Sequence, residues 1–162
     1  MSKIKIEGQH ILTGEIEISG AKNSAVALIP AAILCDEEAI INNVPDISDI
    51  VALEEILLHL NAKIERTEDS VKIDASNIKN KKIDETLSKK LRASYYFMGA
   101  LLGKYKKVQM YFPGGCSIGQ RPINLHLTGF ELLGAKITEE DNFFTIEAEE
   151  LFDKTPEYMH LV

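Results

Sequence analysis

The fold is decided by a stretch that occurs twice, as Asn61-Ala62-Lys63-Ile64 and, 73 residues later, as Gly134-Ala135-Lys136-Ile137. The same offset places Phe144 at the position of Val71. A similarity that recurs at one spacing is typical of a supersecondary unit present in two copies. Because such units bury their apolar faces against their neighbours, the two copies are predicted to pack together.

Upstream of this stretch the two copies are offset by 68 residues. Ala32-Ile33-Leu34 aligns with Ala100-Leu101-Leu102, and Pro45 aligns with Pro113. The change of offset from 68 to 73 predicts five extra residues in the second copy, directly after Pro113. Additions to a repeated scaffold are loops, which carry function more often than stability.

The added residues belong to the stretch PGGCSIGQRP at positions 113–122. Its glycines allow backbone conformations that other residues avoid, and Pro122 suits the first position of a helix. Cys116 is therefore placed close to Arg121 and a helix N-terminus. Both neighbours favour the thiolate of a cysteine, whose ordinary pKa is about 8.5. This arrangement predicts a reactive thiol.

Each copy is predicted to follow the order βαβαββ, because alternating apolar residues indicate strands and apolar helical faces indicate helices. Ser48 is expected to cap a helix, and Asn61 to end it in the left-handed conformation. In the first copy we expect strands at 15–19 and 39–44, a hairpin of 64 with 71–73, and helices at 22–34 and 48–60. In the second copy we expect helices at 88–102 and 122–133, a strand at 108–112 and a hairpin around 139–142. A strand at 3–6 precedes the first copy and is expected to join a different sheet.

Composition excludes several classes of protein. The chain of 162 residues is 45% hydrophobic, which is enough for one core. A net charge of −7 argues against nucleic acid and anionic membranes as partners, because both require a basic surface. The apolar runs are shorter than a membrane span, and the N-terminus MSKIKIEGQH has no signal-peptide core. Cys35 and Cys116 form no CxxC pattern, so the expected location is the cytoplasm.

Three cations fall at or near predicted helix starts, namely Lys22, Arg92 and Arg121. A cation at a helix N-terminus is unfavourable by about 0.3–1 kcal/mol. Taken singly, each side chain could simply extend into water. Taken together beside the cysteine stretch, they predict an anion site, because helix N-termini already favour anions.

These residues carry a family resemblance. Gly20-Ala21-Lys22-Asn23, Leu91-Arg92-Ala93-Ser94 and the stretch 113–122 resemble the UDP-N-acetylglucosamine 1-carboxyvinyltransferases, a branch of the enolpyruvyl transferase family, and the likeness runs from residue 4 to about 148. It implies an α/β (α+β) fold, the inside-out α/β barrel of βαβαββ units, with two of the three units of one domain present. The implied divisions are a strand of the second domain at 1–14, a first unit at 15–80, a second unit with the Cys116 loop at 81–150, and the start of a third unit at 151–162.

The resemblance also implies a chemistry. The family transfers the enolpyruvyl group of phosphoenolpyruvate to the 3-hydroxyl of UDP-N-acetylglucosamine by addition and elimination, releases phosphate, and so begins peptidoglycan synthesis. Cys116 matches the catalytic cysteine, which fosfomycin alkylates. Lys22, Asn23 and Arg121 match the phosphoenolpyruvate contacts. The nucleotide-sugar contacts match Arg92, Arg121, Pro122, Ile123, Asn124 and Leu125. No cofactor or metal is implied.

The sequence departs from the family pattern in two places. Asn124 stands where the family more often has an aspartate, and the sequence ends at Val162. The general-base aspartate and a further arginine of the family's phosphoenolpyruvate site have no counterpart here. We therefore expect an N-terminal fragment or truncated product that does not turn over substrate alone and that self-associates through exposed apolar surface.

Two other functions remain open. The enolpyruvyl transferase of the shikimate pathway shares the repeated fold and phosphoenolpyruvate, but it lacks the cysteine motif. A non-catalytic, degenerate module that binds a nucleotide sugar would show weak ligand binding and no covalent chemistry.

Overall fold

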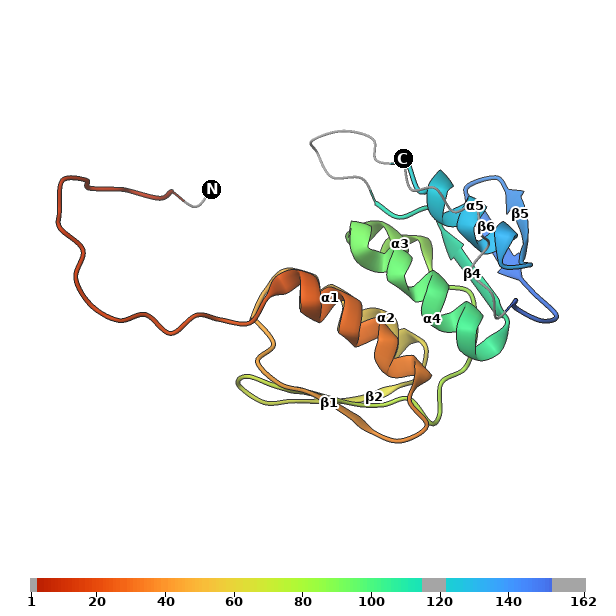
Figure 1. Cartoon of the computed structure of the whole chain (residues 1–162), viewed down its shortest axis with the longest axis horizontal. Coiled ribbons are helices and arrows are strands. Elements are labelled where there is room, and N and C mark those ends of the chain that lie inside the picture. The colour runs from red at the N-terminus through yellow and green to blue at the C-terminus, as the bar shows by residue number, and fades with distance from the viewer. Residues whose placement is uncertain (1–2, 115–121, 153–162) are drawn as a thin grey trace.

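Two three-stranded sheets with the same strand order carry the repeat (Figure 1). The structure is a computed structural model that describes residues 3–114 and 122–152. Cys116, Arg121 and residues 153–162, where the third unit was predicted to begin, lie outside the described residues.

The first sheet has the order β1-β3-β2, with both pairings antiparallel. Val71 and Ile73 are fully buried and alternate with half-buried neighbours, which confirms the predicted hairpin. The first strand is shorter than the predicted 39–44, because the backbone turns to a left-handed φ of 55° at Asn43. The strands of this sheet are β1 (Ala39–Ile41), β2 (Lys63–Arg66) and β3 (Val71–Asp74).

The second sheet repeats this topology in the order β4-β6-β5. Phe144 and Ile146 are fully buried, at the positions that correspond to Val71 and Ile73. The hairpin turns at Asp141, whose φ is 50°. These strands confirm the strand and hairpin predicted for the second copy; they are β4 (Lys107–Tyr111), β5 (Lys136–Glu140) and β6 (Phe143–Glu147).

Strand register corrects the predicted length of the addition. Ile41 pairs with Val71, and Met110 pairs with Phe144. The first strands of the two sheets are thus offset by 69 residues and the hairpins by 73, so the second copy has four extra residues rather than five. The proline alignment was misleading, because Pro113 lies three residues after Met110, whereas Pro45 lies four residues after the equivalent Ile41.

The helices predicted at 22–34 and 48–60 are confirmed. The first ends in a 3₁₀ turn just after Pro30, which has no amide hydrogen for the helical ladder. Asn61 has the predicted left-handed φ, 74°. Ser48, however, is not the cap but the first residue of the helix: Ile47 is the N-cap, and its carbonyl accepts the Ile50 amide at 3.0 Å. These elements are α1 (Lys22–Ala31), the 3₁₀ turn η1 (Ala32–Leu34) and α2 (Ser48–His59).

The single helix predicted at 88–102 is wrong. The chain breaks at Leu91, which is extended with φ −145° and ψ 132°. The hydroxyl of Ser94 donates to the backbone oxygen of Ser88 at 2.8 Å, and both serines are fully buried. This bond satisfies a carbonyl that the break would leave without a helical partner. Arg92 therefore opens a new helical run; the elements are α3 (Glu85–Lys90), the 3₁₀ turn η2 (Arg92–Tyr95) and α4 (Tyr96–Tyr105).

The strand predicted at 15–19 does not form in the described residues, and the strand at 3–6, which was expected to join a different sheet, stays a prediction. Residues 3–20 form an extended arm with no hydrogen-bonded neighbour strand (Figure 1). The isoleucines that suggested these strands, Ile4, Ile6, Ile16 and Ile18, are all at least 85% exposed. A strand needs a partner for its amides and carbonyls, and the alternating pattern alone does not supply one.

The core lies between the helices and the inner faces of both sheets, and it joins the two copies into one apolar cluster. Helix α1 packs against both α2 and α4, so the helices are central and the sheets peripheral. Helix α5 (Asn124–Leu132) begins two residues after Pro122, with Ile123 at its N-cap. Across the two described ranges, the helices lack the combination of length and apolar composition that crossing a membrane requires.

Candidate functional site

Three residues of the predicted site line one cavity. Lys22 and Asn23 reach it from the start of α1, and Arg92 reaches it from the start of η2. The cavity has a volume of about 450 Å³. It is lined by Lys22, Asn23, Val26, Asp49, Lys90, Leu91, Arg92, Ala93, Tyr95 and Tyr96.

A glycine on each side lets the backbone come close enough to build this cavity. A Cβ atom on Gly20 would lie 1.6 Å from the backbone oxygen of Asn43, so no other residue fits at this position, two residues before α1 begins. A Cβ on Gly114 would lie 1.9 Å from the backbone oxygen of Lys89. The Gly114 amide donates to the Ser88 oxygen at 3.3 Å. Gly114 is therefore packed against the end of α3, next to the break at Leu91 after which Arg92 begins η2.

Gly114 was expected to be a glycine because of its conformational freedom. Its φ is not positive, however: the positive-φ glycines among the described residues are Gly14 and Gly134. Gly114 is required instead because another backbone approaches it closely.

The charges at the cavity are predominantly positive. Lys22, Lys90 and Arg92 supply cations, and Asp49 supplies a carboxylate from the first turn of α2. The ammonium of Lys22 lies 2.5 Å from the Asp49 carboxylate, and Lys90 forms an ion pair with Glu55. An anion that enters this cavity therefore encounters cations that already interact with carboxylates.

Helix α1 also presents its N-terminus here. No side chain caps it, and no acidic residue lies in its first turn. The first amides of such a helix have no intrahelical acceptor and favour an anion.

Aromatic stacking connects the cavity to the start of α5. The Tyr95 ring lies 4.5 Å from that of Tyr96 and 4.8 Å from that of His126, measured between centroids, and the Arg92 guanidinium lies 5.7 Å from the Tyr95 ring. Burial, and then a hydrogen bond with Tyr96, raise the pKa of Tyr95. Tyr95 both packs against these rings and lines the cavity.

The other predicted nucleotide-sugar contacts lie apart from this cavity. Pro122, Ile123, Asn124 and Leu125 are not among its lining residues. Ile123 is 6% exposed and belongs to the core, whereas Leu125 is 70% exposed. Cys116 and Arg121 fall outside the described residues, so their predicted roles stay predictions.

Asp49 and Lys90 were missed by the sequence analysis. A carboxylate in the first turn of a helix is commonly a stabilising residue, so Asp49 carried no distinct signal. The position of Lys90 became visible only with the break at Leu91, which the continuous helical pattern concealed.

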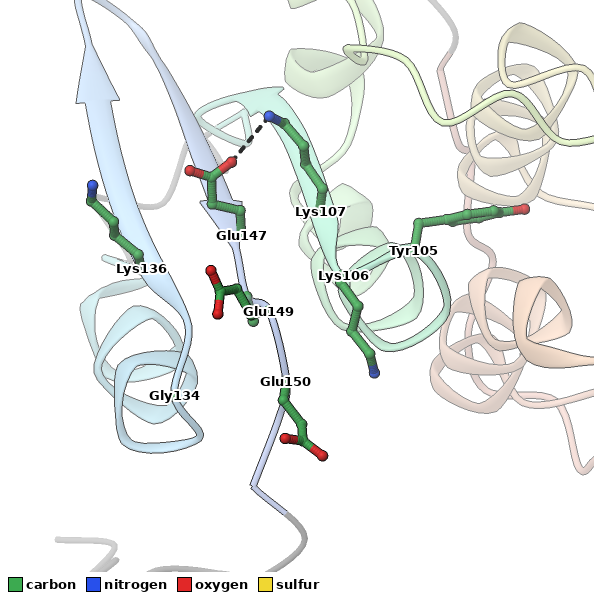
Figure 2. A pocket seen from close by; sticks show the side chains of 9 residues that line it. Tyr105, Lys106, Lys107, Gly134, Lys136, Glu147, Glu149 and Glu150 are labelled. Carbon is green, nitrogen blue, oxygen red and sulfur yellow. Dashed lines mark hydrogen bonds and ion pairs between the residues drawn. The ribbon is translucent and has the colours of Figure 1, made fainter.

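A second hollow, of about 810 Å³, lies at the ends of β4, β5 and β6 (Figure 2). Lysines and glutamates line it together, and Lys107 pairs with Glu147 at 3.0 Å. Its lining mixes opposite charges and includes none of the predicted site residues. The smaller cavity is therefore the candidate site.

Comparison with known proteins gives one family match and several relatives. The family described as EPSP synthase (3-phosphoshikimate 1-carboxyvinyltransferase) matches residues 6–155. UDP-N-acetylglucosamine 1-carboxyvinyltransferase 3 of Caldanaerobacter subterraneus is 47% identical over 93% of this chain, and this chain covers 36% of it. UDP-N-acetylglucosamine 1-carboxyvinyltransferase 2 of Oceanobacillus iheyensis is also 47% identical over 93%, with 35% of it covered. The chain thus spans about a third of the length of these relatives.

Solved structures show the same fold. The enolpyruvyl transferase NikO from Streptomyces tendae superposes with a TM-score of 0.73 over 86% of this chain and 31% of its own, at 22% identity. EPSP synthase from Acinetobacter baumannii superposes with a TM-score of 0.60 over 79% of this chain and 32% of its own, at 15% identity. At these identities the likeness concerns the fold alone, and it confirms the predicted fold class.

Proposed function

This chain belongs to the enolpyruvyl transferase family that the EPSP synthase match describes, and we propose that it contributes the substrate pocket of a UDP-N-acetylglucosamine 1-carboxyvinyltransferase. The reaction transfers the enolpyruvyl group of phosphoenolpyruvate to the 3-hydroxyl of UDP-N-acetylglucosamine. One observation carries the proposal: Lys22, Asn23 and Arg92, from segments about 70 residues apart, line one cavity. The identity of 47% to enzymes of that name supports the choice of substrates.

Phosphoenolpyruvate is assigned to the end of the cavity at α1. Its phosphate and carboxylate suit the Lys22 ammonium, the Asn23 side chain and the uncapped amides of α1. Arg121 would add a second cation. These groups stabilise charge that develops when the double bond is attacked, because they are held in place before the reaction begins.

The nucleotide sugar is assigned to Arg92 and the start of α5. Helix α5 also lacks a side-chain cap and a first-turn acid, and the tilted contact between the Tyr95 and His126 rings connects it to the cavity. A diphosphate could therefore interact with both the guanidinium and the helix N-terminus. Residues 122–125 would contact the nucleotide, mainly through backbone groups where the side chain is buried, as for Ile123.

Cys116 is assigned the proton transfer. As the 3-hydroxyl oxygen bonds to C2 of phosphoenolpyruvate, its proton passes to a carboxylate base, which the resemblance assigns to an aspartate with no counterpart in this sequence, and the Cys116 thiol gives its proton to the methylene carbon C3. The tetrahedral adduct then returns a proton from C3 to the Cys116 thiolate and expels phosphate, which restores the double bond. Gly114, the described residue before this stretch, packs beside Ser88 and Lys89, and the next residue, Lys90, lines the cavity.

The shikimate-pathway transferase is the competing member of the family. The matched family model is named after the shikimate-pathway enzyme, and a solved structure of that enzyme has the same fold as this chain. The cysteine stretch 113–122 and the names of the relatives at 45–47% identity favour the nucleotide-sugar enzyme.

The test is covalent labelling with fosfomycin, read by intact mass. Cys35 is an exposed thiol in the same chain, so Cys35→Ser is the matched control for Cys116→Ser. We expect one adduct on the wild type and on Cys35→Ser, and none on Cys116→Ser. An adduct that disappears only with Cys35→Ser, or no adduct on any of the three, would contradict the assignment and favour a non-catalytic module.

A further inference from the structure

We propose that Asp49 is a built-in competitor of the anionic ligand: its carboxylate binds the Lys22 ammonium, lowers the affinity of the pocket for phosphate groups, and so favours release of the phosphate product. The inference rests on the proposed function, because it presumes that the cavity binds phosphoenolpyruvate and releases phosphate.

The geometry places the two groups in direct contact at the cavity. Lys22 Nζ lies 2.5 Å from Asp49 Oδ2, and both residues line the cavity. They come from the first turns of two different helices, α1 and α2, which pack together. The Asp49 side chain is 24% exposed, whereas that of Lys22 is 54% exposed. The carboxylate is thus the more fixed partner, and the lysine is the one that can turn towards a ligand.

Asp49 differs from the other carboxylates on or near α2. Asp46 pairs with Arg66, and its side chain is 88% exposed. Glu55 pairs with Lys90 but is not itself among the residues that line the cavity. Among the described lining residues, Asp49 is the acidic one. A stabilising acid at the start of α2 would serve equally well if it faced water, so its contact with Lys22 calls for another reason.

The enzyme chemistry supplies that reason. Three cations and an uncapped helix N-terminus bind a phosphate group whether it belongs to the substrate or to the product. Substrate gains further contacts through its carboxylate and enol carbon, which free phosphate lacks. A fixed negative charge weakens both complexes, but free phosphate has fewer contacts to compensate. Asp49 would therefore limit product inhibition.

The test compares phosphate and phosphoenolpyruvate binding by calorimetry at low salt, where charge effects are least screened. Asp49→Asn keeps the shape and removes the charge, while Asp49→Glu keeps the charge. Asp46→Asn is the matched control, because it removes an ion-paired carboxylate three residues away that does not line the cavity. For one unit charge a few ångströms from a partly exposed site, we expect Asp49→Asn to bind phosphate about three- to tenfold more tightly than the wild type.

A second readout separates competition from a structural role. The ¹³Cγ resonance of Asp49 should shift as phosphate is added to the wild type, while that of Asp46 should not. Should Asp49→Asn fold poorly by circular dichroism, Asp49→Ser, which also suits a helix start, replaces it.

The outcomes are distinct. Tighter binding by Asp49→Asn, with Asp46→Asn and Asp49→Glu within twofold of the wild type, supports the inference. Unchanged or weaker binding by Asp49→Asn, when the wild type binds, overturns the inference and leaves the proposed function standing. Absence of binding to either anion by every variant contradicts the anion site itself, and the inference is lost with it.

Discussion

The first and second repeats have the same sheet topology but differ at one edge. In the second repeat, Ile83 forms a parallel bridge with Met110 of β4, and its amide donates to the Gln109 oxygen at 2.9 Å. In the first repeat, the equivalent edge of β1 has no neighbour among residues 3–114 and 122–152. Residues 15–19, which were predicted to form the first strand of this copy, extend away from the sheet (Figure 1).

The consequence is visible in burial. Met110 is fully buried, whereas Ile41, at the same register position in β1, is only half-buried. The chain before α3 is thus paired with its sheet in one copy, whereas the chain before α1 is an exposed arm in the other. The difference shows that alternation specifies which face of a strand is apolar, while a partner decides whether the strand forms.

The most severe test of this comparison replaces an isoleucine in each repeat. Ile83 is fully buried and bridged, so Ile83→Ala should lower the free energy of unfolding by about 2–5 kcal/mol. Ile16 is 89% exposed, so Ile16→Ala should change it by less than about 0.5 kcal/mol. Urea unfolding of both variants measures the difference.

Equal losses in the two variants would break the comparison. They would mean that the arm is packed on the first sheet in solution and that the repeats are symmetric after all. The Ile16→Ala measurement also controls for nonspecific effects of shortening an isoleucine.

Much of the fold could be predicted because its signals are local. The hairpins follow from alternating residues and the left-handed Asn61, and helix α1 follows from its apolar, alanine-rich run. The break at Leu91 could not be predicted, because the hydrogen bond from Ser94 to Ser88 that supports it closes only in the folded chain. The arm could not be predicted because its missing partner is a tertiary property.

The candidate site also contains some residues that the sequence predicted and others that only the folded structure brings to the cavity. Lys22, Asn23 and Arg92 were predicted from motifs and then found around one cavity. Asp49 and Lys90 reach that cavity only through the packing of α2 and the break at Leu91, so no spacing in the sequence identifies them.

The arm provides a test of intermediate size. Its exposed isoleucines and the open edge of β1 can pair between copies, since an unpaired strand edge is a template for another strand. We expect self-association that grows with concentration and that weakens in Ile16→Asp/Ile18→Asp. Sedimentation velocity over a range of concentrations measures it. Leu132→Asp, a partly exposed leucine of the second repeat, is the control and should leave association unchanged; the reverse result would assign it to the second repeat.

The smallest expected effect concerns the ends of the hairpins, where Asp74 in the first repeat corresponds to Glu147 in the second. Hydrogen bonds from Ser76, first from its side chain and then from its backbone amide, lower the pKa of Asp74 below its ordinary value of 3.8. The amide of Ser76 lies 2.9 Å from Asp74 Oδ1. Because the pKa of Asp74 is lowered in the folded state, the ionised carboxylate stabilises the fold at pH values above the unfolded-state pKa. This stabilisation is lost as the pH falls through the folded-state pKa. Ser76→Ala should therefore move the pKa of Asp74 back towards 3.8 in a ¹³C titration, with Glu147 as the internal reference. An unchanged Asp74 titration would show that the serine hydroxyl is not the cause, and would leave the Ser76 amide and the nearby Lys63 as the groups that lower this pKa.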